Sequence, residues 1–388
     1  MKNTLRKENV GSALVKAVLF TGGFLAFVAL VTYNLLNLLG KRTDEGNCRT
    51  YLWRVDSRHY LFGTMHLDPI YFMNAIPDNV KIAHYNSDAV YTEVDMFDTE
   101  HHHKEMKCGL LEENVTLSDV IPSSLYERLE DYLENIQPSL KGLNVTNWRT
   151  MRPSTINFQL SLMPFYVKKT YCEYCLGKLI AAPSCIGSYP SSWPNEEEYY
   201  RDKDKVRFFE HKFHEGVTSL DAHLASAAEV LNKTVGGIET AQERCDLIDN
   251  TPLQLSIVTM NETLNILEKI QNLTEYNTFA EHQINKYRSV EDIREFEKPI
   301  IQLIQKYSNQ SNGPDHLLWK EVEDHDEKEM TMRNKIMTER VSKLIKTSSG
   351  SKLFFAFGMA HFFGENSVVE YLRKRGHTVE RVDAKEKV

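Results

Sequence analysis

Two short segments near opposite ends of the chain share one pattern: a hydrophobic run, a glycine, and a histidine three positions later. LFGTMH places Gly63 before His66, and AFGMAH places Gly358 before His361. Each run is typical of a β-strand, and strand ends pass into loops, where functional side chains are commonly held. Glycine lets the backbone turn or approach a ligand closely. The two histidines can meet in one pocket only if both ends of the chain build the same fold.

Carboxylates follow two further predicted strands. The strand at residues 89–94 carries Glu93, and Asp95 lies two positions later, on the same side of an extended chain. A shorter strand, residues 235–239, ends with Glu239. Four predicted strands therefore each finish on a residue that can bind a metal ion or transfer a proton.

The order of the predicted elements indicates an α/β (α+β) fold with a central mixed β-sheet flanked by helices. Residues 51–62 predict a hairpin that leads to His66. Residues from about 118 to 234 are mostly helical in pattern, which predicts a helical insertion. The final segment, 352–382, reads as strand, helix and strand, and we expect its two strands to pair in parallel.

The N-terminal residues predict one transmembrane helix before this fold. Residues 1–16 are basic, and residues 17–39 form a 23-residue uncharged stretch, long enough to cross a hydrocarbon core of roughly 30 Å. The apolar region of a cleaved signal peptide is shorter, about 7–15 residues, so we expect a signal anchor. The basic flank stays in the cytosol. This arrangement predicts a single-pass type II membrane protein whose domain, residues 43–388, faces the lumen or the extracellular space.

Two other features agree with a lumenal domain. Acceptor sequences for N-glycosylation occur at Asn114, Asn144, Asn232, Asn261, Asn272 and Asn309. All six cysteines follow the membrane segment, at positions 48, 108, 172, 175, 185 and 245. An even number in an oxidising compartment indicates disulfides, although six cysteines allow fifteen pairings. The net charge of −8 argues against nucleic acid as a partner.

The strand-end residues can be combined into one hydrolytic site. His66, Glu93 and His361 would bind a divalent ion and leave positions open for water and substrate. Glu239 would be a further ligand or the general base. Asp95 would orient a histidine. Arg333 falls in the apolar stripe of the last long helix, where a buried guanidinium needs an acid or an anion, so it would hold an oxyanion or a substrate carboxylate.

Simpler interpretations stand beside each of these. A single histidine is more often structural, and a single glutamate is more often a helix cap or an ion-pair partner. The stretch of three histidines at 101–103 is expected to be a solvated loop. Cys172 and Cys175 have the spacing of a zinc or redox pair, but outside the cytosol a disulfide is favoured.

The ordered set of motifs resembles the TIKI branch of the TraB/GumN superfamily. The matching segments span roughly residues 48–384 and include YLFGTMH, YTEVD, SLD at 219–221, GIET at 237–240, Arg333-Asn334 and FAFGMAHF. The resemblance implies a membrane-tethered metalloprotease that uses manganese or cobalt, with zinc left open, and clips N-terminal residues from Wnt ligands to inhibit signalling. Its metal-binding positions correspond to His66, Glu93 and His361 here, and Glu239 and Arg333 match further positions of the family.

The chain departs from this family in two places. Vertebrate members carry a C-terminal hydrophobic anchor, which this sequence does not show, so the N-terminal helix is the expected tether. Residues 171–200 do not follow the family pattern, which bears on substrate recognition more than on chemistry. Two alternatives to the protease remain: a non-catalytic protein that sequesters peptides in signalling, and an esterase on the same scaffold.

Overall fold

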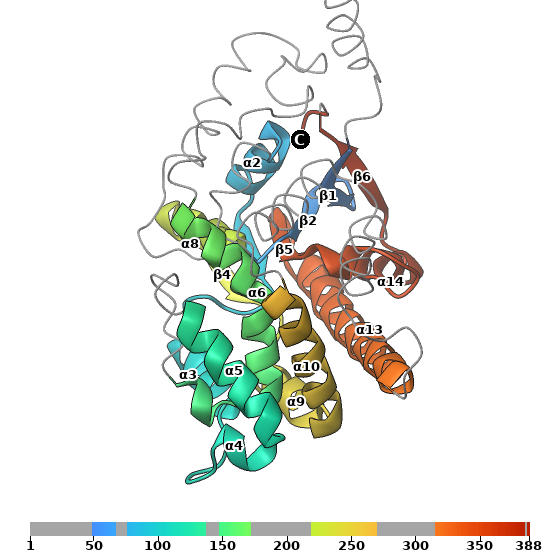
Figure 1. The fold of residues 1–388 in the computed structure, drawn as a ribbon. Coiled ribbons are helices and arrows are strands. Elements are labelled where there is room, and N and C mark those ends of the chain that lie inside the picture. Colours follow the sequence, from blue (N-terminus) through green and yellow to red (C-terminus); the bar gives the residue numbers. More distant parts are fainter. Residues whose placement is uncertain (1–48, 67–75, 137–146, 172–218, 270–314, 385) are drawn as a thin grey trace, which may run out of the picture. The chain divides into compact units, whose positions relative to one another are not determined.

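A computed structural model describes residues 49–66, 76–136, 147–171, 219–269, 315–384 and 386–388 (Figure 1). All of them belong to one unit, Arg49–Val388. The predicted membrane segment, residues 17–39, lies outside the described residues, as do Cys48, Cys172, Cys175 and Cys185. Among the helices that the structure describes, none combines the length and the apolar character needed to cross a bilayer.

The described strands form one mixed six-stranded sheet in the order β4-β3-β5-β2-β1-β6. Their bounds are β1 Arg49–Val55, β2 His59–Thr64, β3 Ala89–Thr92, β4 Thr234–Gly237, β5 Leu353–Gly358 and β6 Val379–Asp383. Strands β4, β3, β5 and β2 pair in parallel, and β1 is antiparallel to both of its neighbours. The mixed α/β class predicted from the sequence is therefore confirmed.

The β1–β2 hairpin is confirmed, and it changes the topology expected for the C-terminus. Its turn contains Asp56 and Ser57, both with positive φ (47° and 65°). Every residue of β2 is buried, so β2 must lie inside the sheet, with β5 on one edge and β1 on the other. The outer edge of β1 then pairs with β6. The expected pairing of β5 with β6 is wrong because the hairpin separates these strands, which still point the same way.

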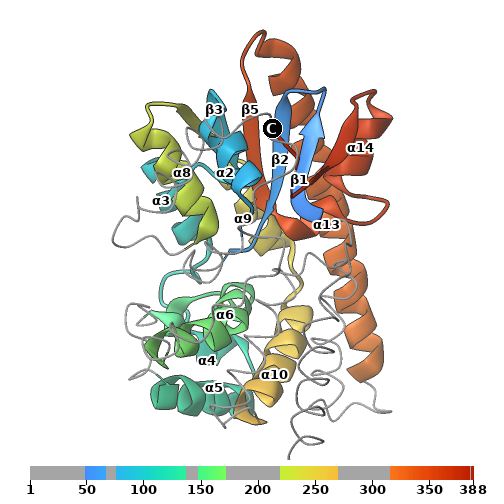
Figure 2. The same cartoon turned by 90° about the horizontal axis from the view of Figure 1, so that it is seen from above.

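Helices cover both faces of the sheet. In Figures 1 and 2, α2 (Asp78–Tyr85) and α8 (Leu220–Val230) lie on one side, with α13 (Asp315–Thr347) and α14 (Val368–Lys374) on the other. Apolar residues from all four helices join one core with the strands. Phe354, Phe355 and Phe357 of β5 are fully buried in it. Burial on both faces explains why β5 reads as a continuous apolar run.

A hydrogen-bond chain ties the hairpin turn to the C-terminal helices. Ser342 Oγ lies 2.8 Å from His377 Nε2, and His377 Nδ1 lies 2.6 Å from Asp56 Oδ2. This connectivity is that of a serine hydrolase triad, but Ser342 is only 2% exposed. A buried hydroxyl cannot contact a substrate. These hydrogen bonds therefore serve to link the hairpin turn to the C-terminal helices.

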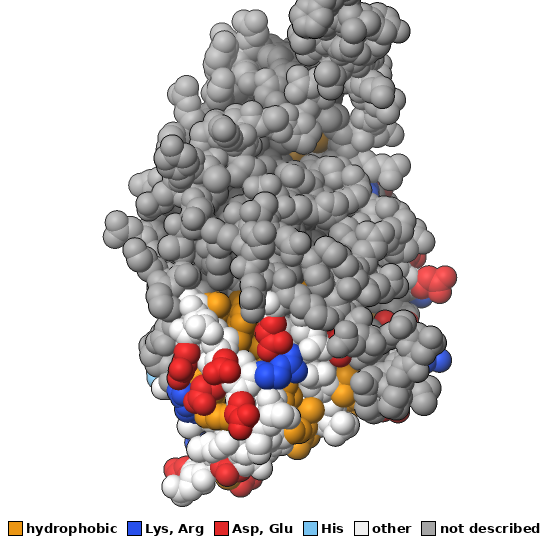
Figure 3. All heavy atoms as spheres, in the orientation of Figure 1, with side chains coloured by type: hydrophobic (Ala, Val, Ile, Leu, Met, Phe, Trp, Pro, Cys, Tyr) orange, Lys and Arg blue, Asp and Glu red, His pale blue; other side chains and the backbone are white. Residues whose placement is uncertain are grey.

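A second core lies among helices that follow β3. It is shared by α4 (Leu117–Val120), α5 (Ser123–Ile136), η3 (Trp148–Thr150), α6 (Pro153–Tyr171) and α10 (Leu253–Lys269). The predicted apolar stripe of α5 is buried in it, namely Leu125, Leu129, Tyr132 and Leu133. Figure 3 shows acidic side chains gathered on the surface over α5. Nearby, α3 (Thr99–Cys108) and α9 (Ala241–Asn250) are joined by the Cys108–Cys245 disulfide.

Candidate metal centre

Four parallel strands end at the same edge of the sheet, and each delivers one predicted site residue there. His66 follows β2 by two residues, Glu93 follows β3 directly, and Glu239 follows β4 by two. His361 lies in η4 (Met359–Phe362), directly after β5. The carboxyl ends of parallel strands are where ligands bind in α/β sheets. The backbone carbonyl of Glu93 also accepts the N–H of Glu239 at 2.7 Å, which fixes these two neighbouring strand ends together.

Glu93 lies between the two imidazoles. Its Oε1 is 3.4 Å from Nε2 of His66 and 3.4 Å from Nε2 of His361. The same oxygen accepts the backbone N–H of Gly358 at 2.6 Å. A Cβ on Gly358 would lie 2.9 Å from His66 Nε2 and 3.0 Å from Glu93 Oε1. Gly358 is therefore needed for close approach to the site rather than for a turn.

Gly63 has a packing role instead of the predicted turn. It lies inside β2, which continues to Thr64, and it pairs with Phe357 of β5. A Cβ there would lie 3.2 Å from the Cβ atoms of Tyr51 and Met359. The glycine thus lets η4, which carries His361, pack directly on β2.

The outer nitrogen of each imidazole has its own partner. His66 Nδ1 lies 2.7 Å from Oδ2 of Asp221, whose Oδ1 accepts the Thr64 hydroxyl at 2.6 Å. His361 Nδ1 lies 2.6 Å from Oδ1 of Asn334. These acceptors hold a proton on Nδ1, so the Nε2 atom of each ring faces Glu93. Such partners orient histidine ligands at metal sites.

Asp95 does not orient a histidine, contrary to the prediction. Strand β3 ends at Thr92, so Asp95 is not on a shared strand face with Glu93. The Asp95 carboxylate accepts the backbone N–H of Phe97 at 3.0 Å. Asp221, near the start of α8, supplies the carboxylate instead. Asp221 and Asn334 lie in the SLD and Arg333-Asn334 motifs of the sequence, but no local pattern there predicts that they orient a histidine.

Arg333 joins the two glutamates. Its Nε donates to Glu239 Oε1 at 2.7 Å, and its Nη2 donates to Glu239 Oε2 at 2.8 Å and Glu93 Oε2 at 2.9 Å. The expectation that this inward-facing arginine meets an acid is therefore confirmed. Both oxygens of Glu239 are engaged, and its side chain is 3% exposed. In this structure Glu239 is held in an ion pair with Arg333, and its role as a further ligand or general base stays a prediction.

The electrostatics of the cluster favour an ionised Glu93. Burial alone raises the pKa of Glu93, but the adjacent His361, His66 and Arg333 outweigh it and hold that pKa well below its usual range. Partial burial lowers the pKa of His66, yet the carboxylates of Asp221 and Glu93 raise it well above its usual value. Burial lowers the pKa of His361, and Arg333 acts in the same direction.

The donor chemistry of this cluster fits a divalent cation. With both imidazoles neutral, the three carboxylates of Asp221, Glu93 and Glu239 face two guanidiniums, those of Arg333 and Arg244, which leaves one uncompensated negative charge. The ligand atoms are still too far apart to share one ion. His66, Glu93 and His361 do not offer three ligand atoms, one from each residue, that all lie within 4.8 Å of one another. The two imidazoles must approach each other to share an ion. The His66 side chain is 43% exposed and has room to do so.

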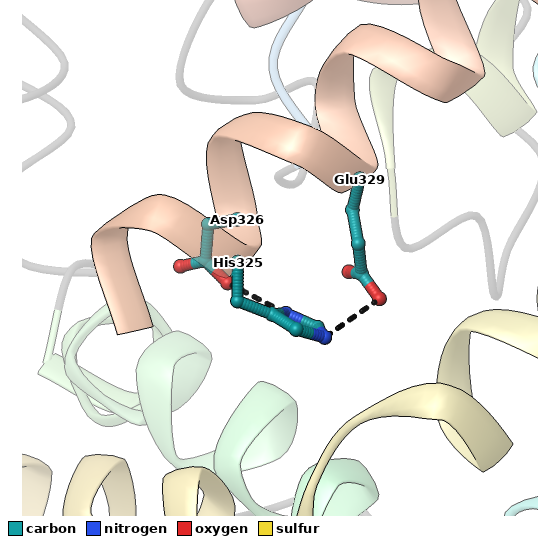
Figure 4. A group of neighbouring side chains, drawn as sticks. All are labelled: His325, Asp326 and Glu329. Atoms are coloured by element: carbon teal, nitrogen blue, oxygen red, sulfur yellow. Dashed lines mark ion pairs between the residues drawn. The ribbon is translucent and has the colours of Figure 1, made fainter. Parts of the chain in front are cut away.

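A second group of potential ligands lies on α13. Among the described residues, His325, Asp326 and Glu329 meet the 4.8 Å spacing (Figure 4). His325 Nδ1 lies 3.8 Å from Asp326, and its Nε2 lies 3.5 Å from Glu329. The imidazole sits between the carboxylates, so its two nitrogens face different partners. The imidazole therefore bridges the two carboxylates in this structure.

The three neighbouring histidines and the predicted glycosylation acceptors lie outside the cluster. The three histidines at 101–103 lie in helix α3 rather than in a loop, and His101 is buried. Asn114 and Asn232 are exposed with positive φ, as accessible glycosylation acceptors would be. Asn261 lies within α10, and its Oδ1 accepts a hydrogen bond from Arg128 at 2.6 Å. Positions 144, 272 and 309 lie outside the described residues.

Comparisons with known proteins find relatives that are named metalloproteases. Metalloprotease TIKI1 of Danio rerio is 27% identical over 353 residues, which cover 88% of this chain and 65% of that protein. Metalloprotease TIKI2 of Xenopus tropicalis is 26% identical, with 89% and 62% covered. Metalloprotease TIKI1 of Homo sapiens is 24% identical, with 88% and 64% covered. The chain thus spans just under two thirds of the length of these relatives.

No solved structure matches the chain. The model of the TraB/PrgY/gumN family matches residues 51–177 and 207–381, which include all four strand-end residues of the cluster. The chain therefore belongs to the TraB/PrgY/gumN family.

Proposed function

We propose that the chain is a metal-dependent protease whose active site is the cluster around Glu93. The observation that carries this proposal is the convergence of His66, Glu93 and His361 at the carboxyl edge of four parallel strands. The relatives named metalloprotease support hydrolysis of a protein or peptide. By family resemblance, the ion is manganese or cobalt.

In this proposal, His66, Glu93 and His361 hold the ion, which would polarise the scissile carbonyl and favour loss of a proton from the attacking water. Asp221 and Asn334 keep both Nε2 atoms turned inward. Glu93 remains ionised, as a carboxylate ligand of the ion must be.

Arg333 stabilises the oxyanion that develops on the carbonyl. In the described residues its hydrogen bonds to Glu93 and Glu239 use Nε and Nη2, so Nη1 is the donor proposed for the substrate. A fixed donor at the position of developing charge is worth more than a mobile one. Glu239 holds the guanidinium in place through its two hydrogen bonds.

We further propose that residues 17–39 tether the protease to a membrane with the domain facing the lumen or cell exterior. The disulfide between Cys108 and Cys245 supports an oxidising compartment. N-terminal clipping of secreted proteins, with Wnt ligands as the first candidates to assay, is the proposed role.

The test measures peptide cleavage by the purified full-length chain in chelator, and then after addition of manganese or cobalt. Metal-dependent amide cleavage that is lost in folded His66→Ala and His361→Ala variants is expected. Full activity in chelator would rule out the metal role. Cleavage of esters alone would identify an esterase, and peptide capture without product would identify a sequestering protein.

A further inference from the structure

A large cavity lies among the helices next to the candidate metal centre. Its volume is about 990 Å³, and it is lined by residues of α3, α6, α9, α10 and α13. Its lining includes Met106, Leu110 and Phe158, which are 62%, 39% and 56% exposed. A cluster of large apolar side chains exposed to solvent often marks a binding surface. Binding sites for peptides and small ligands have this size and this apolar character.

The polar part of the lining contacts the candidate metal centre at one residue and lies close to it along the chain at two others. Arg244 lines the cavity, and its Nη1 lies 3.8 Å from Glu239 Oε2. Glu329 also lines it, one helical turn before Arg333 on α13. His102 lines it too, and its Nε2 is 3.2 Å from the carbonyl of Met96, in the segment that follows Glu93. One wall of the cavity therefore lies beside Glu239.

The chemistry of the walls defines the occupant. Phe158 and Met106 offer aromatic and thioether surface to an apolar side chain. Arg244 and Glu329 offer a donor and an acceptor to the carbonyl and N–H groups of an extended backbone. A peptide that presents a bulky apolar side chain satisfies both kinds of wall, whereas a small polar peptide leaves the apolar wall in water.

We propose that this cavity binds the peptide substrate beside its scissile bond and selects segments that carry a bulky apolar residue. This inference rests on the proposed protease function and adds its substrate preference. The residues that set the preference are Phe158 and Met106, and Arg244 links the cavity to the reacting end of the site.

The experiment uses the full-length chain and fluorescent, end-blocked hexapeptides of glycine and serine in which one phenylalanine is placed at each position in turn. Binding is measured by fluorescence polarisation in chelator, and kcat/KM is measured with manganese. We expect the best phenylalanine position to exceed the all-polar peptide by at least about tenfold in both measurements, since burial of a Phe side chain supplies that much.

Two variants change the cavity from exposed positions. Phe158→Ala removes part of the apolar wall, and Ser161→Trp fills the space from the same helix. Both should reduce the preference for phenylalanine to within about threefold, measured as the ratio of kcat/KM for the best phenylalanine peptide to kcat/KM for the all-polar peptide. Val230→Ala on α8, equally an exposed apolar residue but not part of the cavity lining, should keep the full preference.

The outcomes separate this inference from the proposed function. Phenylalanine-selective binding that Ser161→Trp abolishes, without any cleavage, would support the cavity and refute the protease. Cleavage without selectivity, or selectivity that both variants retain, would overturn the cavity assignment and leave the protease standing. If no peptide is either bound or cleaved, both the cavity assignment and the protease function are overturned.

Discussion

Replacing Asp221 by asparagine should weaken metal binding by about 10- to 100-fold. Asp221 is 1% exposed, and its two oxygens accept separately from the Thr64 hydroxyl and from His66 Nδ1. Asparagine has the same shape but one acceptor oxygen, so one of these donors loses its partner. A hydrogen bond to a charged group contributes about 1.5–3 kcal/mol, and each 1.4 kcal/mol is roughly tenfold in affinity. The loss expected for a carboxylate that orients a histidine ligand has the same size.

The assay is isothermal titration of manganese into the full-length chain and the Asp221→Asn variant, with circular dichroism to confirm that both are folded. Asp95→Asn is the matched control, because Asp95 is the carboxylate that sequence pattern favoured and the structure places on the Phe97 N–H instead. Its affinity should stay within about twofold of the parent. Equal affinity in Asp221→Asn, or a larger loss in Asp95→Asn, would refute the proposed orientation of His66.

Four further predictions concern the metal centre, the disulfide and a buried histidine. Gly358→Ala should abolish manganese binding in titration without loss of the fold, because its Cβ would lie 2.9 Å from His66 Nε2. Arg333→Lys should lower kcat in the peptide assay by about 10² or more, since one ammonium cannot replace the guanidinium's paired hydrogen bonds to Glu239. Replacing Cys108 and Cys245 by serine should lower the free energy of unfolding in urea by about 2–5 kcal/mol. Burial, together with the nearby charge of Lys233, lowers the pKa of His84 to about 3 in the folded protein. In the unfolded chain this pKa returns to about 6.5. The unfolded chain thus binds the extra proton, so unfolding free energy should fall as pH decreases from about 6.5 towards 3, and a His84→Gln variant should lose part of this slope.

The location of the site could be predicted from the sequence because strand ends are visible in it. The runs before His66 and His361 are apolar at nearly every position, as expected of strands buried on both faces. Parallel strands in one sheet bring their carboxyl ends to one edge, so Glu93 and Glu239 fall beside the histidines. The burial of Arg333 followed from helical periodicity, and its acidic partners followed from the cost of an unpaired buried charge.

The partners that orient the imidazoles could not be predicted in this way. Asp221 is 155 residues from His66 in sequence, and nothing local distinguishes it from Asp95, which is two residues from Glu93. Which carboxylate reaches a ring nitrogen depends on how α8 packs on the sheet. The predicted pairing of β6 with β5 was wrong for a related reason. The partner of β6 is set by the free edge of β1 and not by the helix that connects β6 to β5.

The most direct test of the metal centre is the metal content of the purified full-length chain after dialysis against manganese, measured by inductively coupled plasma mass spectrometry. The proposed site predicts about one ion per chain, and none above background in a folded His66→Ala/His361→Ala double variant. The same metal content in both proteins would contradict a centre built on these two histidines and Glu93.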